Sequence, residues 1–574
     1  MRRNIAALAE REYDVVIIGG GIFGVCAAWD AALRGLSVAL IERGDFAHAT
    51  SANCFKMVHG GIRYLQHADL IRIRESSKER SVLLRIAPHL VQPLPIVIPT
   101  YGHGMKGKEI LGAGLFVYDL LTADRNVGIS DPARRIPRGQ FISRQDVLDL
   151  FPHLEKNGLT GAAIICDAQM YSAPRLALSF LQSATLAGAE AANYVEAIKL
   201  RRHNGRVSGV EANDGLTGDK LEIRAKVVVN AAGPWAEHFL KSQDLRLKSE
   251  STYSRDAAFV VARRLLGKYA LAVPGRTKDP DAILSRQSRH LFLVPWRNYT
   301  LVGVWHVVHN GSPDSFTVSP EDLQGFIDEI NEAYAGINLT LDDVLLWNAG
   351  LVLFGNNQTG TADLSYGKRS RIIDHGQEHG VEGLITLIGV RYTTARREAS
   401  RAIDLVVQKL GKPAAKCATA TTPIHGGRVE SFNTLVEGAI NHSYSALKHE
   451  SMNALLRNHG SEYQAVLRYL GENSTWAETV GPSAMIKAEV IHAVREEMAQ
   501  TLEDVVYRRT DLASGAHPGD AALRSCAELM AAELGWNSSR IRKEVDEVTA
   551  GFHRCAVKKD GKAQGYSRAE KSGF

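Results

Sequence analysis

The sequence feature that most constrains the fold is the stretch from Tyr13 to Glu42, where a strand, a glycine turn, a helix and a second strand are predicted to follow one another. A β-branched run precedes Gly19, Gly21 and Gly24, which have G-x-G-x-x-G spacing. In this pattern the first glycine permits a tight turn, the second lets backbone N–H groups approach a pyrophosphate, and the third lets the helix pack on the strand. The stretch therefore predicts a Rossmann-type unit that binds a dinucleotide.

Glu42, the last residue of the second predicted strand, narrows the choice of dinucleotide. In folds of this kind an acidic residue roughly 20 positions beyond the glycines binds the hydroxyl pair of a ribose. A carboxylate at that place disfavours a ribose 2′-phosphate, which leaves FAD or NAD as the ligand. A glycine triplet alone is weak evidence, but here strand, triplet, helix, strand and acid all occur in order.

Composition indicates a globular protein of several domains. The chain has 574 residues, of which 45% are hydrophobic and 23% charged, enough for roughly two to four domains. The net charge is only +5 and no basic stripe with interleaved aromatics occurs, so we expect no nucleic-acid partner. The six cysteines form no C-x-x-C pair, so we expect neither a disulfide framework nor a metal site. No apolar stretch is long enough for a signal peptide or a membrane span.

The order of the predicted elements indicates an α/β fold with a discontinuous nucleotide-binding domain. A proline-bounded strand from Pro93 to Pro99 leaves that domain, strand-like segments dominate from 251 to 310, and helical periods recur from 431 to 552. We expect a Rossmann-type domain, an antiparallel β substrate-cap domain and an all-α C-terminal domain. The predicted bounds are 1–92, 159–250 and 345–411 for the Rossmann-type domain, 93–158 and 251–344 for the cap, 412–427 for a linker, 428–556 for the helical domain and 557–574 for a flexible tail.

A short apolar segment between Gly102 and Leu121 follows two lysines and has two interpretations. It can be a core helix of the cap, or a surface that dips into a bilayer beside anionic head groups. The segment is short for a membrane element, so we expect the core helix. In the helical domain, the adjacent Arg508 and Arg509 are expected to be solvated or to form an interdomain salt bridge.

Three further stretches are expected to surround the cofactor. A valine-rich strand ends in the small residues of NAAGPW at 230–235, at the sheet edge where α/β folds bind ligands, although a plain strand-to-helix turn is the alternative. Another strand leads into Arg391 and a helix start at Thr393, which can offer a cation and N–H donors to a cofactor ring. The loop from 43 to 64 supplies Lys56, His59 and Arg63.

Taken together, these stretches resemble the FAD-dependent glycerol-3-phosphate dehydrogenase family, within the D-amino-acid-oxidase-like flavoproteins. The resemblance covers about residues 13–510 and rests on YDVVIIGGGIFG, HGGIRYLQH, IAPHL, GLFVYDLL, NAAGPWA, LVPW, LITLIGVRYTT and LEDVVYRRT. It implies FAD as the cofactor, a phosphorylated polyol as the substrate and a quinone at a membrane as the electron acceptor. It is compatible with a cytoplasmic location or a peripheral one on the inner face of the cell membrane, and with a homodimer.

The resemblance also implies a set of site residues. Arg63 and Tyr64 stand where the family binds the substrate phosphate, and Arg391 stands where it usually has a lysine. We expect substrate binding by Arg63, Tyr64 and Arg391, and catalysis by Arg391 with His59 or His306 as the base. The expected cofactor-binding residues are Gly19, Gly21, Gly24, Glu42, Arg43, Thr50, Ser51, His59, Gly60, Gly61, Ala232, Gly233, Trp235, Gly389, Arg391, Tyr392 and Thr393.

Several positions depart from the family pattern, and they gather in the expected substrate site. The family's AGLRP-like motif ends here in Val352 and Leu353, so an arginine expected on the phosphate is absent. Its GSH-like strand appears as 256–258 (DAA), with Ala258 last, and its GTTD motif as 303–306, which ends in His306. A clamp that lacks one arginine binds a dianion about 2–5 kcal/mol less well if nothing replaces it. We therefore keep a larger polyol phosphate or a carboxylate open as the substrate.

Three classes of function follow from these residues. The first is a flavin dehydrogenase of glycerol 3-phosphate or a related polyol phosphate. The second is a flavin oxidase or dehydrogenase of a hydroxy acid or an amine, which hydrogen peroxide release would reveal. The third, a flavin-containing binding protein or one that modifies nucleic acid, is disfavoured because no basic stripe with interleaved aromatics occurs and the substrate-cap pattern is intact.

Overall fold

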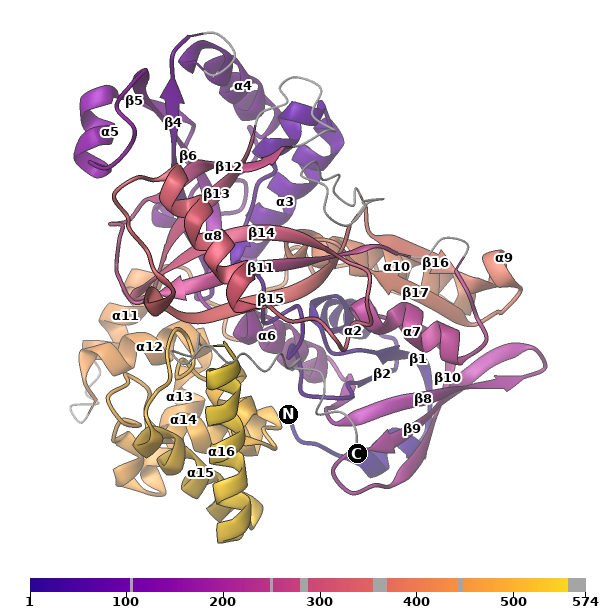
Figure 1. Ribbon diagram of the computed structural model, residues 1–574. Coiled ribbons are helices and arrows are strands. Elements are labelled where there is room, and N and C mark those ends of the chain that lie inside the picture. Colours follow the sequence, from indigo (N-terminus) through magenta and orange to yellow (C-terminus); the bar gives the residue numbers. More distant parts are fainter. Residues whose placement is uncertain (104–106, 248–250, 279–287, 355–368, 442–446, 556–574) are drawn as a thin grey trace.

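The computed structural model describes residues 1–103, 107–247, 251–278, 288–354, 369–441 and 447–555. Two β-sheets and a helical C-terminal region make up this part of the chain (Figure 1). The predicted three-part architecture is therefore confirmed. The predicted tail, residues 557–574, lies outside the described residues.

The first sheet is the Rossmann-type sheet, with the strand order β16-β17-β10-β1-β2-β7. β1 pairs in parallel with both β2 and β10, so that Val15 lies opposite Val38 and Val227. The predicted β-branched run is central and buried on both faces, as parallel strands covered by helices require. The strands are β1 (Glu12–Ile18), β2 (Val38–Ile41), β7 (Glu190–Ala192), β8 (Val195–His203), β9 (Arg206–Asp214), β10 (Lys220–Asn230), β16 (Arg371–Asp374) and β17 (Leu384–Ile388).

The second sheet, the cap sheet, has the order β15-β11-β14-β13-β12-β4-β6-β3, and β5 pairs with β6. Nearly all of its pairs are antiparallel; β12 with β4 is parallel. Its strands are β3 (Met57–Val58), β4 (Val91–Tyr101), β5 (Gln140–Ser143), β6 (Leu159–Met170), β11 (Tyr253–Val261), β12 (Ala270–Lys278), β13 (Ser288–Trp296), β14 (Tyr299–His309) and β15 (Val344–Leu353). β6 and β15 lie beyond the predicted boundaries at 159 and 345, because each pairs along its length with a cap strand.

The helices divide among the three parts. Those beside the first sheet are α1 (Ile5–Glu10), α2 (Ile22–Leu33), α6 (Ala173–Leu186), α7 (Ala236–Ser242), α9 (His375–His379) and α10 (Ala395–Leu410), with short turns η4 (Gly233–Trp235) and η6 (Tyr392–Thr394). Those that accompany the cap sheet are η1 (Ile62–His67), α3 (Leu70–Ile86), α4 (Lys108–Leu121), η3 (Pro132–Arg134), α5 (Arg144–Leu150), α8 (Pro320–Ala333) and η5 (Leu341–Asp343). The C-terminal region holds α11 (Phe432–Asn441), α12 (His449–His459), η7 (Gly460–Glu462), α13 (Tyr463–Leu467), η8 (Arg468–Gly471), η9 (Ser474–Ala477), α14 (Lys487–Glu497), η10 (Asp504–Arg509), α15 (Asp520–Leu534) and α16 (Ser538–Cys555).

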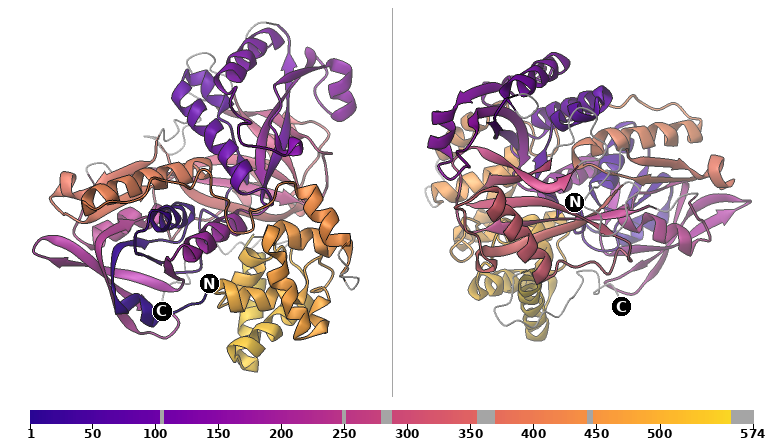
Figure 2. Two further views of the ribbon diagram at one scale, coloured as in Figure 1. Left: turned by 180° about the vertical axis from the view of Figure 1, so that it is seen from behind. Right: turned by 45° about the horizontal axis from the view of Figure 1, so that its top comes forward.

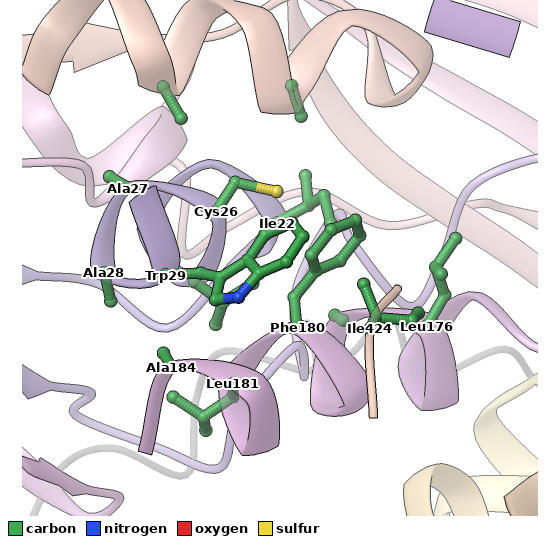
Figure 3. Close-up of a cluster of buried hydrophobic side chains, with 14 of the residues drawn as sticks. Ile22, Cys26, Ala27, Ala28, Trp29, Leu176, Phe180, Leu181, Ala184 and Ile424 are labelled. Atoms are coloured by element: carbon green, nitrogen blue, oxygen red, sulfur yellow. The ribbon is translucent and has the colours of Figure 1, made fainter. Parts of the chain in front are cut away.

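The helix that follows the glycine triplet is held in place by aromatic packing. Trp29 of α2 and Phe180 of α6 are both buried, and their ring centroids lie 5.3 Å apart (Figure 3). Small residues of α2, among them Ala28, allow the two helices to approach. This contact fixes α2, which begins at the glycine triplet, against α6.

Helix α4 contradicts the expectation of a core helix between 102 and 121. Only Leu115 and Tyr118 of α4 are buried. Phe116 and Leu120, one turn apart, are 73% and 70% exposed, and Ile110 and Val117 are also exposed. The sequence pattern does not show whether α4 is buried in the protein or exposed. An apolar stripe on a helix has the same period whether it packs on a protein core or contacts a lipid bilayer.

The helical region packs against one side of the rest of the molecule (Figure 2). At the contact, Arg175 of α6 donates from Nη1 to both carboxylate oxygens of Glu497, each at 2.7 Å. Its Nη2 lies 3.2 Å from Nδ1 of His459, whose ring meets that of His492 edge-on. The interface is thus a buried cluster of charged and titratable groups.

This interface predicts a loss of stability in acid. Burial, with the charge of Arg175 adding to it, lowers the pKa of His459 to about 3. A histidine in an unfolded chain has a pKa of about 6.5. Below that pH, His459 binds a proton in the unfolded chain but stays unprotonated in the folded one. The free energy of unfolding therefore falls as the pH is lowered from the upper of these two values toward the lower, and His459 contributes on the order of 1 kcal/mol of that loss at pH 5.5.

We expect His459→Gln to remove this contribution, because glutamine can still accept from Arg175 but cannot be protonated. Urea unfolding measures the free energy of unfolding at pH 7.5 and at pH 5.5. The decrease between the two pH values should be smaller in the variant than in the unmodified protein, by on the order of 1 kcal/mol. An unchanged difference would show that His459 already carries a proton in the folded state or stays solvated.

Candidate active site

A cavity of about 1070 Å³ is lined by residues of both sheets. Ligand sites commonly have volumes of about 300–1,000 Å³, so this cavity is large enough for an extended ligand. Most of the predicted site residues line it, namely Gly19, Gly21, Glu42, Arg43, Thr50, Ser51, His59, Gly61, Arg63, Tyr64, Ala232, Gly233, Trp235, His306, Gly389, Arg391, Tyr392 and Thr393.

The glycine triplet forms a cradle that side chains would obstruct. Gly19 has a φ of +106°, and a Cβ on it would lie 2.7 Å from the carbonyl oxygen of Ala231. A Cβ on Gly24 would lie 1.9 Å from the oxygen of Gly19, so Gly24 serves helix packing and does not line the cavity. The N-cap residue of α2 is Gly21, which has no side chain to cap the helix. The positive end of the helix dipole is therefore directed at the cavity. These residues fit the pyrophosphate of a dinucleotide.

Glu42 lies at the cavity wall at the end of β2. Its Oε2 accepts from the backbone N–H of Gly20 at 2.6 Å, and its Oε1 accepts from that of Gly44 at 2.9 Å. The carboxylate is therefore held between the glycine turn and the following loop, in the place where a ribose-binding acid is expected.

Three arginines surround one phenol ring in the cavity. The guanidinium carbons of Arg72, Arg391 and Arg63 lie 4.7, 5.4 and 5.7 Å from the ring centroid of Tyr64. Arg391 also donates from Nη1 to the hydroxyls of Ser76 and Tyr64, at 3.1 and 3.3 Å. Burial favours the neutral phenol, but Arg391 and Arg63 outweigh it and hold the pKa of Tyr64 below its usual value. The arrangement is suited to an anion with several oxygens.

His59 lies beside this arginine cluster, with its ring centroid 6.0 Å from that of Tyr64. Burial, together with Arg391, Arg63 and Arg80, lowers the pKa of His59 to about 3. The imidazole therefore stays neutral through the physiological range and is a weak proton acceptor.

His306 lies on the cap sheet with a carboxylate partner. Its Nδ1 is 2.7 Å from Oδ1 of Asp256 on the neighbouring strand β11, and the two residues pair in register. The hydroxyl of Ser254 donates to the same oxygen at 2.6 Å. Both His306 and Asp256 line the cavity. A histidine whose Nδ1 is bonded to a carboxylate has a fixed ring orientation and presents Nε2 as the proton acceptor.

Two predicted neighbours of the cofactor lie elsewhere. Gly60 does not line the cavity, because its N–H donates to Asp167 and a Cβ on it would collide with Arg80 and Tyr118. Lys56 does not line it either. Its ammonium is buried 4.8 Å above the ring of Trp296, and burial lowers its pKa to about 8.

Two residues of the site were not singled out from the sequence. Arg72 belongs to a helix in which basic and acidic residues are interleaved, a pattern typical of a solvated face, and its charge gives no sign that α3 turns this side toward the cavity. Asp256 was noted only as a departure from a motif. Pairing of β11 with β14 places it opposite His306, and that register was not predictable from either strand alone. Val352 and Ala258, two of the other departures, line the cavity.

Comparison with known proteins agrees with this geometry. A family model described as FAD dependent oxidoreductase matches residues 14–383, and the C-terminal domain of alpha-glycerophosphate oxidase matches 417–541. A glycerol-3-phosphate dehydrogenase of Synechocystis sp. is 32% identical over 95% of this chain and 97% of its own. An aerobic glycerol-3-phosphate dehydrogenase of Staphylococcus haemolyticus is 28% identical over 96% and 98%. The structure of glycerol-3-phosphate dehydrogenase from Bacillus halodurans, complexed with FAD, superposes with a TM-score of 0.75 at 25% identity and covers 98% of each chain.

The fold and the cavity define an FAD-dependent oxidoreductase. The glycine cradle, the acid at the end of β2 and the cap sheet over the cavity are the features that this class shares. With relatives at this identity over nearly its whole length, the chain belongs to the FAD-dependent glycerol-3-phosphate dehydrogenase family.

Proposed function

We propose that this enzyme oxidises the secondary alcohol of glycerol 3-phosphate, or of a related polyol phosphate, to the ketone and passes the electrons to a quinone. The product from glycerol 3-phosphate is dihydroxyacetone phosphate. The observation that carries the proposal is the cluster of three arginines around Tyr64, in the same cavity as the glycine cradle. The names of the relatives support the same substrate.

The arginine cluster would bind the substrate phosphate. Arg63, Tyr64 and Arg391 are the predicted contacts, and Arg72 adds a third guanidinium that is itself paired with Asp69. Val352 stands where an arginine was expected, so Arg72 would be the additional guanidinium of this cluster, 4.7 Å from the ring centroid of Tyr64. A phosphate dianion interacts more strongly with this cluster of cations than a carboxylate does, because it carries more negative charge. The cluster therefore favours a phosphorylated substrate.

His306 is the better placed of the two predicted bases. Oxidation of an alcohol requires a group that accepts the hydroxyl proton, and Asp256 would stabilise His306 once it carries that proton. His59 would instead contribute a neutral ring to the phosphate subsite, since burial and three neighbouring cations lower its pKa.

The remaining cavity residues would hold FAD, which when bound supplies the acceptor for the two electrons of the alcohol. Gly19, Gly21 and Glu42 would contact the pyrophosphate and ribose. The other cavity-lining residues predicted for the cofactor are Arg43, Thr50, Ser51, Gly61, Ala232, Gly233, Trp235, Gly389, Tyr392 and Thr393.

Anaerobic bleaching of the flavin absorbance on purified protein tests the proposal. Glycerol 3-phosphate should bleach the band at micromolar to low millimolar concentration, the ordinary range for a substrate. Rapid bleaching by a hydroxy acid or an amine, with none by glycerol 3-phosphate, would assign the enzyme to the alternative substrate class. Hydrogen peroxide release in air would further mark an oxidase.

Quinone as acceptor calls for contact with a membrane, and α4 offers a surface for it. Phe116 and Leu120 form its most exposed apolar face, and Ile71 of the neighbouring α3 is 60% exposed. Ile110 and Val117 are also exposed, but they line the cavity as well. Single exposed apolar residues are ordinary, but a clustered face of this kind marks an interaction site. No helix within the described ranges combines the length and the hydrophobicity needed to cross a bilayer. We infer a peripheral position on the inner face of the cell membrane, with the apolar face of α4 in the lipid.

The substitution Phe116→Ser should weaken this contact. Removing a buried phenylalanine side chain from an apolar phase costs about 1.5–3 kcal/mol, roughly ten- to hundredfold in partition. Cosedimentation with phospholipid vesicles measures the change. Leu186→Ser is the matched control, because Leu186 is 75% exposed on α6, outside the apolar face. Equal losses in both variants would exclude α4 as the membrane contact.

A further inference from the structure

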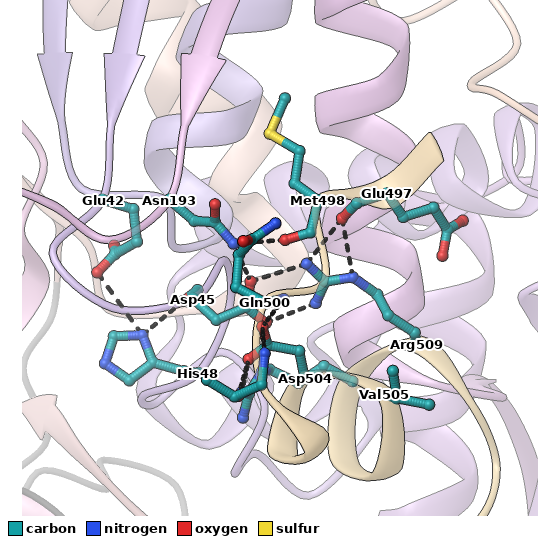
Figure 4. A network of polar contacts seen from close by, with 12 residues as sticks. Glu42, Asp45, His48, Asn193, Glu497, Met498, Gln500, Asp504, Val505 and Arg509 are labelled. Carbon is teal, nitrogen blue, oxygen red and sulfur yellow. Dashed lines mark hydrogen bonds and ion pairs between the residues drawn. The ribbon is translucent and has the colours of Figure 1, made fainter. Parts of the chain in front are cut away.

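We propose that the helical C-terminal region completes the FAD site, with Arg508 and Arg509 acting as positioning residues for the cavity wall. They hold Asp45, which lies in the loop after the ribose-binding acid Glu42. Figure 4 shows Arg509 and Asp45 in this network, which joins η10 of the helical region to the loop. The proposal rests on the FAD of the family and is independent of the substrate.

Asp45 is fully enclosed by donors from outside its own loop. Its carboxylate accepts from Nε of Arg508 at 2.5 Å, and from Nη1 and Nη2 of Arg509 at 2.5 and 2.7 Å. Asn193 adds a fourth donor at 2.9 Å. The side chain of Asp45 is 0% exposed and that of Arg509 is 1% exposed. Paired, charge-assisted bonds of this geometry fix both position and orientation.

The helical region also holds a second segment of the same wall. The hydroxyl of Tyr194 donates to Asp504 at 2.7 Å, and Asp504 is in turn paired with Arg508. The backbone N–H of Tyr194 donates to the carbonyl of Gly44 at 2.8 Å, so the two wall segments are also joined to each other. Asn193 donates to the carbonyl of Met498 in the helical region.

These contacts lie immediately behind the cavity. Asp45, Asn193 and Tyr194 do not line it, but the residues on either side of them do, namely Glu42 and Arg43, Ala47 to Ser51, and Val195 to Ile198. His48 links Asp45 to Glu42, because its Nδ1 lies 2.6 Å from the carbonyl of Asp45 and 3.6 Å from the carboxylate of Glu42. Asp45 and its partners Arg508 and Arg509, called the clamp below, thus hold the cavity wall at Glu42, the acid that would bind the ribose.

The position of the clamp determines which property of FAD it affects. Glu42 marks the adenosine end of a dinucleotide, whereas Arg391 and the arginine cluster mark the reacting end of the cavity. Loosening the wall at Asp45 should therefore weaken the binding of FAD and leave the reactivity of bound flavin unchanged. A residue that merely stabilised the helical region would not produce this separation.

The test uses Arg509→Met in the full-length protein after removal of the flavin. Titration with FAD, followed by the quenching of its fluorescence, should give a dissociation constant at least tenfold higher than that of the unmodified protein. The reduction potential of FAD in the saturated variant should be unchanged. Asp45→Asn, which keeps the shape of the side chain and removes its charge, should give the same direction of change.

Arg175→Met is the matched control. Arg175 is an equally buried arginine at the same interface, but it pairs with Glu497 and His459 and does not contact the wall segments. Its dissociation constant should stay within threefold of the unmodified value. If Arg509→Met does not fold, Asp45→Asn decides, through the rise in melting temperature that added FAD produces.

Dissociation constants within threefold of the unmodified protein for both clamp variants, or an equal increase in Arg175→Met, would overturn the proposal. None of these readouts involves a substrate, so failure of glycerol 3-phosphate to bleach the flavin would leave them intact.

Discussion

Replacing Arg391 by methionine is expected to lower kcat/KM for glycerol 3-phosphate by roughly 30- to 5,000-fold, because a buried charged contact to an anion is worth about 2–5 kcal/mol. Methionine keeps much of the volume and removes the donors to Ser76 and Tyr64. Steady-state kinetics with an artificial acceptor measures the change, on protein whose flavin absorbance shows full loading.

The same variant allows a sharper comparison with an uncharged alcohol. Glycerol has no phosphate, so the unmodified enzyme and Arg391→Met should oxidise it at similar low rates. Arg391→Lys should recover part of the activity, since it restores the charge without the planar pair of donors. Arg397→Met is the matched control, because Arg397 is paired with Glu75 nearby and does not line the cavity. An equal loss with glycerol would show that Arg391 acts on the flavin or the fold and does not bind the phosphate.

Replacing His306 by alanine is expected to slow flavin reduction by about 10²- to 10⁴-fold, the range for removal of a general base. Stopped-flow measurement of flavin reduction under anaerobic conditions isolates this step from the transfer to the acceptor. Asp256→Asn should cause a smaller loss in the same step, because the base remains but its orienting carboxylate does not.

His309→Ala serves as the control for His306. It lies on the same strand, is half-buried, contacts the carbonyl of Ser312 and does not line the cavity. The rate of flavin reduction in His309→Ala should therefore match that of the unmodified enzyme. If His59→Gln lost more activity than His306→Ala, the base would lie in the arginine cluster and the assignment of His306 would be wrong.

The nucleotide-binding part of the fold was predictable because its signals are local. The glycines, the β-branched strand and Glu42 lie within one short stretch, and each has a mechanical role that tolerates few other residues. The cap was predictable only as a group of strands. The sequence did not show that β6 and β15 belong to it, because pairing partners far apart in the chain leave no local pattern.

The candidate site divides in the same way. Arg63, Tyr64 and Arg391 were found through motifs, and all three lie together in the cavity. Arg72 was missed because a charged residue on an amphipathic helix has the same appearance whether it meets solvent or a ligand. The exposure of α4 likewise depends on which surface the tertiary fold brings against the helix. Of the two expectations for Arg508 and Arg509, the interdomain salt bridge is the one the structure shows, with Asp45 as the partner.

The contact between Asp45 and Arg509 spans 464 residues of sequence, which has a consequence for biosynthesis. Domains generally fold in order as they emerge from the ribosome, so the Rossmann-type sheet can form while the helical region is still being translated. The wall at Asp45, however, gains its buried partners only after the chain has been extended past Arg509. Cofactor loading would then be a late event on the nascent chain, and truncation before η10 would leave an otherwise folded nucleotide domain that retains flavin poorly.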